Sequence, residues 1–366
     1  MSNKKINVWS YLEDHQKQKQ DISVLVNKVF ASGQLILGNN VKDFENRFSN
    51  WVGVKYGVGV GNGTDAIKLA LLALNIKKGD EVITVSNTAV PTVSAIVETG
   101  ARPVFCDVED DYNISVEQIE SLITSKTRAV LVVHLYGHPA EINKIKAICK
   151  RNNLYLIEDC AQSHGSKYKN KLTGSFGDIS AFSFYPTKIL GGYGDGGMCL
   201  TNKASYEKKL KMLRFYGMKD LYFSEIENGV NSRLDEVQAA ILNYKLNTLN
   251  ADIKKRRKIA SLYKHELINT GLILPEEKSG YYHSYYLYVV RHKNRNNIIK
   301  KLKENDIYCN ISYPYPIHTM PPFKKYKKSN MKNTNKISKE IFSLPMFPAL
   351  SEKNQYKVIK QIKKLI

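Results

Sequence analysis

The 366-residue chain has few cysteines, and they are scattered. The five cysteines stand singly, and no two of them form a CxxC pair. An odd number of isolated cysteines argues against a disulfide framework and against a zinc site, so we expect no bound metal. Unpaired cysteines suit a reducing compartment, and we expect the protein in the cytoplasm. The cysteines are Cys106, Cys149, Cys160, Cys199 and Cys309.

Long apolar segments are also missing. No apolar run approaches the roughly 20 residues that span a bilayer. The N-terminus is polar from Met1 to Asn7 and charged again at Glu13 and Asp14, so it lacks the apolar core of a secretory signal. We therefore expect neither a membrane protein nor an exported one.

Acidic residues are scarce, chiefly in the C-terminal third. The net charge is +21, and residues 251–366 carry 25 lysines and arginines against 8 aspartates and glutamates. Lysine-rich runs such as 254–258 and 324–328 are usually solvated helix faces, so we expect no nucleic-acid partner. A cationic surface is compatible with attraction of a diphosphate substrate.

Short β-branched runs alternate with helical patterns along the first 250 residues. This alternation is typical of an α/β domain with a mostly parallel sheet. The predicted helices cover 64–74, 116–123, 142–151 and 234–249, each with an apolar stripe. The predicted strands cover 81–85, 103–108, 129–134, 154–158, 179–184 and 197–201.

A change of composition at Ala251 predicts a domain boundary. We expect a large α/β domain over residues 1–250 and a smaller α+β domain over 251–366. In the smaller domain the tyrosine-rich stretch 281–290 predicts a strand, and 296–304 and 352–365 predict helices. No internal repeat and no low-complexity linker are present.

A glycine turn follows the predicted strand that ends at Val60. In Gly61-Asn62-Gly63-Thr64-Asp65 the glycines allow close approach of an anion, and the next residues offer N–H groups at a helix N-terminus. Thr64 or Asp65 is equally suited to capping the helix. The pattern Gly61-x-Gly63-x-x-Ala66 also matches a loose dinucleotide fingerprint, which leaves a nicotinamide-dependent oxidoreductase open.

Acidic residues end the apolar strand at 154–158. A buried carboxylate such as Asp159 requires a cationic partner, and a protonated pyridine nitrogen is one. Gln162 stands three residues further on and can reach another polar edge of the same ring. The alternative is that Asp159 caps the following helix.

A lysine separates an aromatic strand from a glycine-rich loop. In FSFYPTKILGGYGDGG (182–197), Lys188 follows Ser183 and Tyr185. A desolvated amine at this position can lose its proton and form a Schiff base with an aldehyde.

With these motifs in view, the chain resembles the DegT/DnrJ/StrS family of sugar-nucleotide aminotransferases along nearly its whole length. The resemblance implies the fold of aspartate aminotransferase, which is pyridoxal-phosphate fold type I, and a non-enzymatic relative would lack Lys188 or Asp159. The motifs that carry the resemblance are GNGTDAIKLAL (61–71), EDCAQSHG (158–165), FSFYPTKILGGYGDGG (182–197) and NSRLDEVQAAIL (231–242).

The resemblance implies a role for several residues. Lys188 is the Schiff-base lysine, Asp159 pairs with the pyridine nitrogen, and Gln162 contacts the ring hydroxyl. Asn231 reaches the phosphate of the other subunit's cofactor in a homodimer with shared active sites, although a helix cap is its alternative role. The residues implied to hold the phosphate are Gly63, Thr64, Asp65 and Ser183.

The substrate side of the site departs from the family pattern at two positions. Ala89 stands where many relatives have an aromatic residue or histidine stacked on the cofactor ring, and Ser312 stands where relatives have a histidine before Tyr313. The residues implied to contact substrate are Tyr185, Tyr313, His318, Lys219 and Tyr222.

The segment VSNTAVPTVSAI (85–96) is most similar to 3-aminotransferases that act on dTDP-3-oxo-6-deoxyhexoses. We expect glutamate as amino donor and a product used in surface polysaccharide such as lipopolysaccharide O-antigen. The gluco and galacto ketones stay open, as does the alternative of C4 amination of a UDP- or GDP-4-keto sugar.

Overall fold

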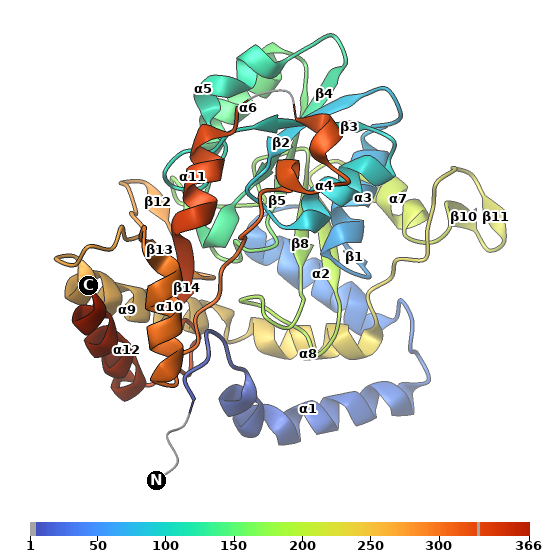
Figure 1. The fold of residues 1–366 in the computed structure, drawn as a ribbon. Coiled ribbons are helices and arrows are strands. Elements are labelled where there is room, and N and C mark those ends of the chain that lie inside the picture. Colours follow the sequence, from blue (N-terminus) through green and yellow to red (C-terminus); the bar gives the residue numbers. More distant parts are fainter. Residues whose placement is uncertain (1–4, 328–329) are drawn as a thin grey trace.

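A seven-stranded sheet forms the centre of the computed structural model, which describes residues 5–327 and 330–366. Its strands are β1 (Tyr56–Val60), β2 (Glu81–Val85), β3 (Arg102–Cys106), β4 (Thr127–Val133), β5 (Tyr155–Asp159), β8 (Ile179–Ser183) and β9 (Gly197–Thr201). The strand order is β1-β9-β8-β5-β4-β2-β3, and only β9 runs against its neighbours (Figure 1). The predicted α/β fold with a mostly parallel sheet is confirmed.

Helices cover both faces of this sheet. Neighbouring residues of β9 point to opposite sides: Cys199 Sγ bonds to the carbonyl of Ala66, whereas Met198 and Leu200 pack against Phe44. The first face is covered by α3 (Gly63–Ala73), α4 (Val90–Glu98) and α7 (Ala204–Leu213), and the second by α2 (Asn39–Val52) with α8 (Glu236–Leu246) behind it. Two further helices of this part are α5 (Val116–Ile119) and α6 (Ile142–Arg151).

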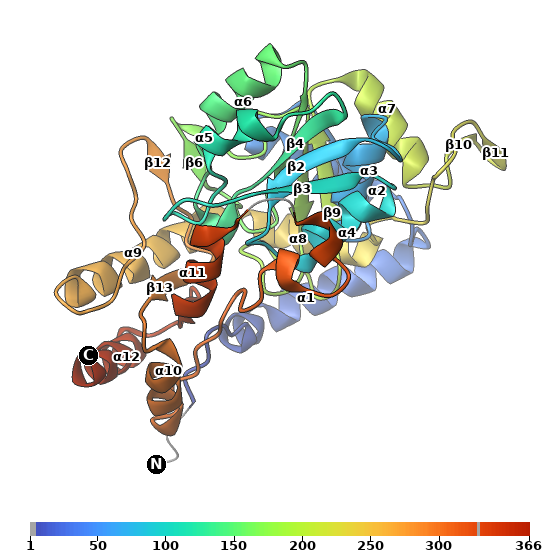
Figure 2. The same ribbon diagram turned by 45° about the horizontal axis from the view of Figure 1, so that its top comes forward.

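The N-terminal helix α1 (Leu12–Ser32) lies against α8 at the edge of the molecule (Figures 1 and 2). Only Ile22 and Val29 of this helix are buried, while Leu12, Val24 and Phe30 are exposed. The helix therefore presents apolar side chains that this single chain does not cover.

The C-terminal third gathers around its own apolar cluster, beside the main sheet (Figure 1). Its elements are α9 (Leu249–Leu267), β13 (Tyr288–Arg291), α10 (Arg295–Glu304), β14 (Ile341–Leu344) and α12 (Glu352–Leu365), whereas α11 (Lys332–Glu340) joins the core of the main sheet through Ile337. The cluster combines residues between Ile259 and Ile362 with Ile6 from the N-terminal segment. Helix α9 continues through Ala251, and the domain division at residue 250 stays a prediction.

Three predicted elements are wrong in extent. The helix over 116–123 is instead α5, which ends at Ile119, followed by a short 3-10 helix over Glu120–Leu122. The single helix over 234–249 is instead α8, which ends at Leu246, followed by α9 from Leu249. The single strand over 281–290 is broken into β12 (Tyr281–Tyr282) and β13, because Tyr285 adopts a left-handed conformation with φ of 52°. The guanidinium of Arg256 binds the carbonyls of Tyr285 and Tyr286 where the strand is interrupted.

Small hairpins complete the fold. Strands β6 (Lys167–Tyr168) and β7 (Lys171–Leu172) pair with each other, and β6 also pairs with β12. The hairpin β10 (Met218–Asp220) and β11 (Phe223–Ser224) projects from the body of the molecule (Figure 1). No helix within residues 5–327 and 330–366 combines the length and apolarity needed to cross a bilayer.

Candidate active site

A cavity of about 200 Å³ lies at the carboxyl edge of the sheet, where β5 and β8 end and α3 and α4 begin. This edge is where ligands bind in open α/β sheets. Eight of the residues singled out from the sequence line the cavity together: Gly63, Thr64, Ala89, Asp159, Gln162, Ser183, Tyr185 and Lys188.

The N-terminus of α3 faces the cavity with two unused amides. The side chain of Asn62 caps the helix by accepting the N–H of Asp65 at 2.9 Å. The N–H groups of Gly63 and Thr64 have no partner in the described part of the chain, so they remain for an anion. A Cβ on Gly63 would lie 2.7 Å from Ser183 Cβ, which explains the glycine.

Asp65 was also implied to hold the phosphate, but its hydrogen bonds are made within its own chain. Its N–H serves the Asn62 cap, and its carboxylate accepts the hydroxyl of Ser232 at 2.6 Å and Asn62 Nδ2 at 3.0 Å. Asp65 therefore braces the turn rather than offering a free donor.

The carboxylate of Glu158 does not line the cavity, and both of its oxygens are engaged. It accepts the N–H groups of Gly174, Phe176 and Gly177 at 2.7, 2.8 and 2.7 Å and lies 3.0 Å from His134 Nε2. Burial alone would raise the pKa of Glu158, but these donors outweigh it and hold the pKa below its ordinary value.

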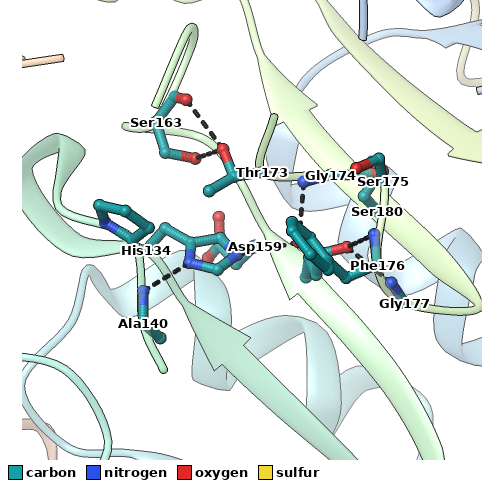
Figure 3. Close-up of polar contacts among 12 residues, drawn as sticks. His134, Ala140, Asp159, Ser163, Thr173, Gly174, Ser175, Phe176, Gly177 and Ser180 are labelled. Atoms are coloured by element: carbon teal, nitrogen blue, oxygen red, sulfur yellow. Dashed lines mark hydrogen bonds and ion pairs between the residues drawn. The ribbon is translucent and has the colours of Figure 1, made fainter. Parts of the chain in front are cut away.

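His134 completes this arrangement. Its Nδ1 accepts the N–H of Ala140 at 3.0 Å, so Nε2 carries the proton and donates to Glu158 (Figure 3). His134, Glu158 and Cys160 place possible metal ligands within 4.8 Å of one another. Because both histidine nitrogens and the carboxylate are engaged, we assign the group to a structural hydrogen-bond network.

Asp159 lies next to Glu158 on β5 and, by strand alternation, on the opposite face. It accepts the Thr92 hydroxyl at 2.9 Å and the Ala161 N–H at 3.1 Å. Burial raises the pKa of Asp159 above its ordinary value, because these two donors and the nearby charge of Lys188 only partly offset the loss of water. The carboxylate has room for a further donor from the cavity.

The amide of Gln162 has a fixed orientation. Its Oε1 accepts the backbone N–H of Tyr136 at 2.8 Å, so its Nε2 must be the group that donates to Tyr313 Oη at 2.8 Å. The second Nε2 hydrogen remains available at the cavity that Gln162 lines. Tyr136 adopts φ of 59°, an uncommon conformation for a bulky residue.

Lys188 enters the cavity from the loop after β8. Its Nζ lies 5.0 Å from the centroid of the Tyr286 ring, a favourable contact for an ammonium group. The Tyr286 hydroxyl is 3.1 Å from that of Thr187, which ties the aromatic ring to the same loop.

Tyr313 and His318 belong to a C-terminal segment that packs beside the cavity. Tyr313 joins the site through Gln162, whereas His318 bonds to Ser86 Oγ at 2.7 Å and is buried. The carbonyl of Ser312, at the position that departs from the family pattern, accepts the Tyr136 hydroxyl. Ser312 thus contributes a backbone acceptor to Tyr136, whose N–H in turn binds Gln162.

Three residues singled out from the sequence lie away from the cavity in this chain. Lys219 and Tyr222 belong to the projecting hairpin; Lys219 pairs with Glu225 at 2.9 Å, and Tyr222 is 89% exposed. Asn231 is exposed and precedes α8 by five residues, and the cap position of that helix is Asp235. The capping alternative for Asn231 is therefore wrong.

Four residues near the cavity were missed from the sequence: Thr88, Thr92, Tyr136 and Tyr286. Thr88 and Thr92 stand four apart within the segment 85–96, a spacing that places side chains on one face wherever a helix forms. Nothing in the sequence alone distinguishes Tyr136 or Tyr286 from the other 21 tyrosines.

Residues 16–363 match the model of the DegT/DnrJ/EryC1/StrS aminotransferase family. The chain belongs to this family. It is 46% identical over 367 residues to a dTDP-3-amino-3,4,6-trideoxy-alpha-D-glucose transaminase of Micromonospora megalomicea subsp. nigra, with 98% of each chain covered. It is 41% identical over 349 residues to a dTDP-3-amino-3,6-dideoxy-alpha-D-galactopyranose transaminase of Aneurinibacillus thermoaerophilus, covering 95% of this chain and 96% of the other.

Among solved structures, NtdA from Bacillus subtilis with bound cofactor PMP superposes with a TM-score of 0.92 at 28% identity. The superposition covers 100% of this chain and 86% of NtdA. The family assignment makes this protein an aminotransferase that depends on pyridoxal phosphate. It also decides against the nicotinamide-dependent oxidoreductase that the glycine pattern left open.

The residues in the cavity fit this cofactor. A helix N-terminus with two free amides suits its phosphate, a buried carboxylate with unused acceptor capacity suits its protonated ring nitrogen, and a lysine is present for its aldehyde. The small side chain of Ala89 lines the same cavity, so the ring gains no aromatic stacking partner at that position.

Proposed function

We propose that the enzyme transfers an amino group from glutamate to C3 of a dTDP-3-oxo-6-deoxyhexose. The observation that carries the proposal is the identity, over nearly the whole length of both chains, to two transaminases named for 3-amino sugars on dTDP. The first is named for a 3,4,6-trideoxyglucose, which has no hydroxyl at C4, and the second for a 3,6-dideoxygalactose, so the configuration at C4 of the ketone stays open.

The roles of the cavity residues follow from their geometry. The N–H groups of Gly63 and Thr64 and the hydroxyl of Ser183 hold the cofactor phosphate. Asp159 would accept a hydrogen bond from the ring nitrogen, and Gln162 would donate its remaining N–H to the ring oxygen. When bound, pyridoxal phosphate supplies the aldehyde that receives the amino group and the ring that withdraws electrons.

Lys188 has two tasks in this proposal. Its amine would hold the cofactor through the aldehyde, and its Nζ, once free, would carry a proton between substrate and cofactor. The contact with the Tyr286 ring and the tie from Tyr286 to Thr187 restrict where the amine can swing. Tyr185 lines the mouth beside Lys188 and is half exposed, as expected for a substrate contact.

We further propose that two chains share each active site in a homodimer. Among the described residues that line the cavity, Lys188 is the only lysine or arginine, whereas Asp159 and Asp195 also line it. A doubly charged phosphate thus has two amides and one hydroxyl but no cation of its own. Asn231 is exposed, and the hairpin β10–β11 carries exposed apolar side chains, so both suit contact with the active site of the other chain. There Lys219 and Tyr222 would contact substrate.

We also propose a cytoplasmic enzyme whose product enters a surface polysaccharide such as lipopolysaccharide O-antigen. The five cysteines are free in the structure, and four of them are buried, which suits a reducing compartment.

The decisive test uses purified enzyme, ¹⁵N-labelled glutamate and a panel of dTDP-3-oxo-, dTDP-4-oxo- and UDP-4-oxo-sugars. The proposal predicts ¹⁵N at C3 of a dTDP-6-deoxyhexose by NMR. Labelling only at C4, or labelling only of UDP sugars, would refute the proposed substrate while leaving the aminotransferase assignment in place.

A further inference from the structure

A threonine of α4 holds the carboxylate of Asp159. Thr92 Oγ1 donates to Oδ2 at 2.9 Å, while the Ala161 N–H donates to Oδ1 at 3.1 Å. Each carboxylate oxygen is therefore held by a different donor, and the group cannot rotate freely about its Cβ–Cγ bond. Thr92 is buried, so water does not compete for its hydroxyl.

The direction of this hydrogen bond is set by a second hydroxyl. Thr88 Oγ1 lies 2.9 Å from Thr92 Oγ1. A hydroxyl has one proton, and Thr92 gives its proton to Asp159, so Thr88 must be the donor between the two threonines. Thr88 therefore donates to Thr92, and Thr92 donates to the carboxylate. Hydrogen bonds linked in this way polarise one another.

The position of these threonines suits an anion. Thr92 is the third residue of α4, and Thr88 immediately precedes the cap residue Ala89. The first turn of a helix carries a partial positive charge that favours a nearby carboxylate. A β-branched side chain has few rotamers in a helix, so little conformational freedom is lost when the hydroxyl is held.

We propose that Thr92 is a positioning residue, which fixes the Asp159 carboxylate for the ring nitrogen of the cofactor and favours its charged form. This inference rests on the proposed function of Asp159. Lys188 also favours the charged carboxylate through its charge, and the ring of His134, the hydroxyl of Tyr313 and the thiol of Cys160 lie near it. Within the described residues, Thr92 is the side chain that donates to it directly.

Three variants separate this role from simple packing. Thr92→Val keeps the shape and removes the hydroxyl, and Thr92→Ser keeps the hydroxyl. The matched control is Thr84→Val on β2, because Thr84 is buried and its Oγ1 has no partner in the described part of the chain. Thermal unfolding of each holoenzyme verifies folding, and Thr92→Ser keeps the test decisive if Thr92→Val is unstable.

We expect Thr92→Val to lower turnover about tenfold and to weaken retention of pyridoxal phosphate through gel filtration by a similar factor, the scale of one hydrogen bond to a charged group. The acidic limb of its pH–rate profile should move to higher pH, because the carboxylate loses a donor that favours its charged form. Thr92→Ser should recover most of both losses, and Thr84→Val should match wild type.

A double-mutant cycle tests the role of Thr92 separately from the role of Asp159. In an Asp159→Asn background, Thr92→Val should cost much less than in wild type. If Asp159→Asn alone leaves turnover and cofactor retention intact, the proposed function of Asp159 fails. If Asp159→Asn is impaired but Thr92→Val costs the same in both backgrounds, or behaves like Thr84→Val, the Thr92 inference is overturned.

Discussion

Two neighbouring carboxylates of β5 are buried to nearly the same degree and yet differ in the direction of their pKa shifts. Glu158 is 0% exposed and Asp159 is 4% exposed. Glu158 accepts hydrogen bonds from three backbone amides and a histidine, and its pKa is lowered. Asp159 accepts one amide and one hydroxyl, and its pKa is raised.

The difference lies in the number of donors, since burial is common to both. A carboxylate whose acceptor sites are filled by its own chain is part of the scaffold. A carboxylate that is buried, short of donors and lining a cavity has capacity left for a ligand, and such groups cluster at functional sites. The pair thus separates a structural acid from a functional one, although both end the same strand.

Exchanging Asp159 for asparagine should give the largest functional loss. Asp159→Asn keeps the shape and removes the charge that faces the cofactor ring, so we expect turnover to fall about 10³-fold, the scale for loss of a preorganised electrostatic partner. The melting temperature should be unchanged or higher, because a neutral amide costs less to bury. Steady-state kinetics and calorimetry on the same preparation check both halves.

Glu158→Gln should show the reverse pattern. Its new NH₂ group would oppose amide donors such as those of Gly174 and Gly177, so we expect the free energy of unfolding to fall by about 3 kcal/mol. Turnover per cofactor-loaded molecule should fall less than about tenfold. A Glu158→Gln enzyme that is stable but as inactive as Asp159→Asn would reverse the assignment of the two acids.

His164 extends the comparison to a buried group with no hydrogen-bond partner. Neither ring nitrogen is paired within the described residues, and burial among Phe48, Phe182 and Phe184 lowers the pKa of His164 to about 3. The unfolded chain takes up this proton near pH 6.5, so the stabilising contribution is complete above that pH and is lost as pH falls toward 3.

Replacing His164 by phenylalanine should make the free energy of unfolding depend less steeply on pH. Between pH 6 and 4 the wild type should lose about 1.4 kcal/mol per pH unit more than His164→Phe, the slope for one proton. Urea unfolding at several pH values measures the difference. Parallel curves for the two proteins would show that His164 is protonated in the folded state as readily as in the unfolded chain.

Asn231 should give the smallest effect, because it is exposed and acts only across the proposed dimer. Asn231→Ala should weaken retention of pyridoxal phosphate about tenfold, the scale of one hydrogen bond to a charged group, while the dimer persists by analytical ultracentrifugation. Adding the cofactor should shift dilute wild-type protein toward dimer. A fully active monomer, or unchanged cofactor retention in Asn231→Ala, would contradict the shared site.

The sheet could be predicted from the sequence because its buried parallel strands are continuous apolar runs between helical patterns. The stretch 281–290 is rich in tyrosine and valine, which predicts a strand, but the left-handed Tyr285 interrupts it where Arg256 binds its carbonyl. Helices α1 and α2 have no counterpart among the predicted elements. In α1 only Ile22 and Val29 are buried, so its apolar stripe is too thin to recognise.

The residues of the site could be predicted from the sequence more easily than their hydrogen bonds and pKa shifts. Gly63, Asp159 and Lys188 each follow a recognisable strand, and the structure places them around one cavity. The sequence does not separate Asp159 from Glu158, because the donors that fill Glu158 come from the loop 174–177 and from His134. Thr92 lies 67 residues from Asp159, so their contact depends on the tertiary fold.

The most direct test of the account is to find the lysine that carries the cofactor. Borohydride reduction of the yellow holoenzyme makes the lysine–cofactor bond permanent, and peptide mass spectrometry then locates the pyridoxyl group. We expect the pyridoxyl group on Lys188, and we expect the Lys188→Ala protein to be unlabelled and inactive. Labelling of another lysine, such as the half-buried Lys245, or turnover by Lys188→Ala near the wild-type rate would contradict this expectation.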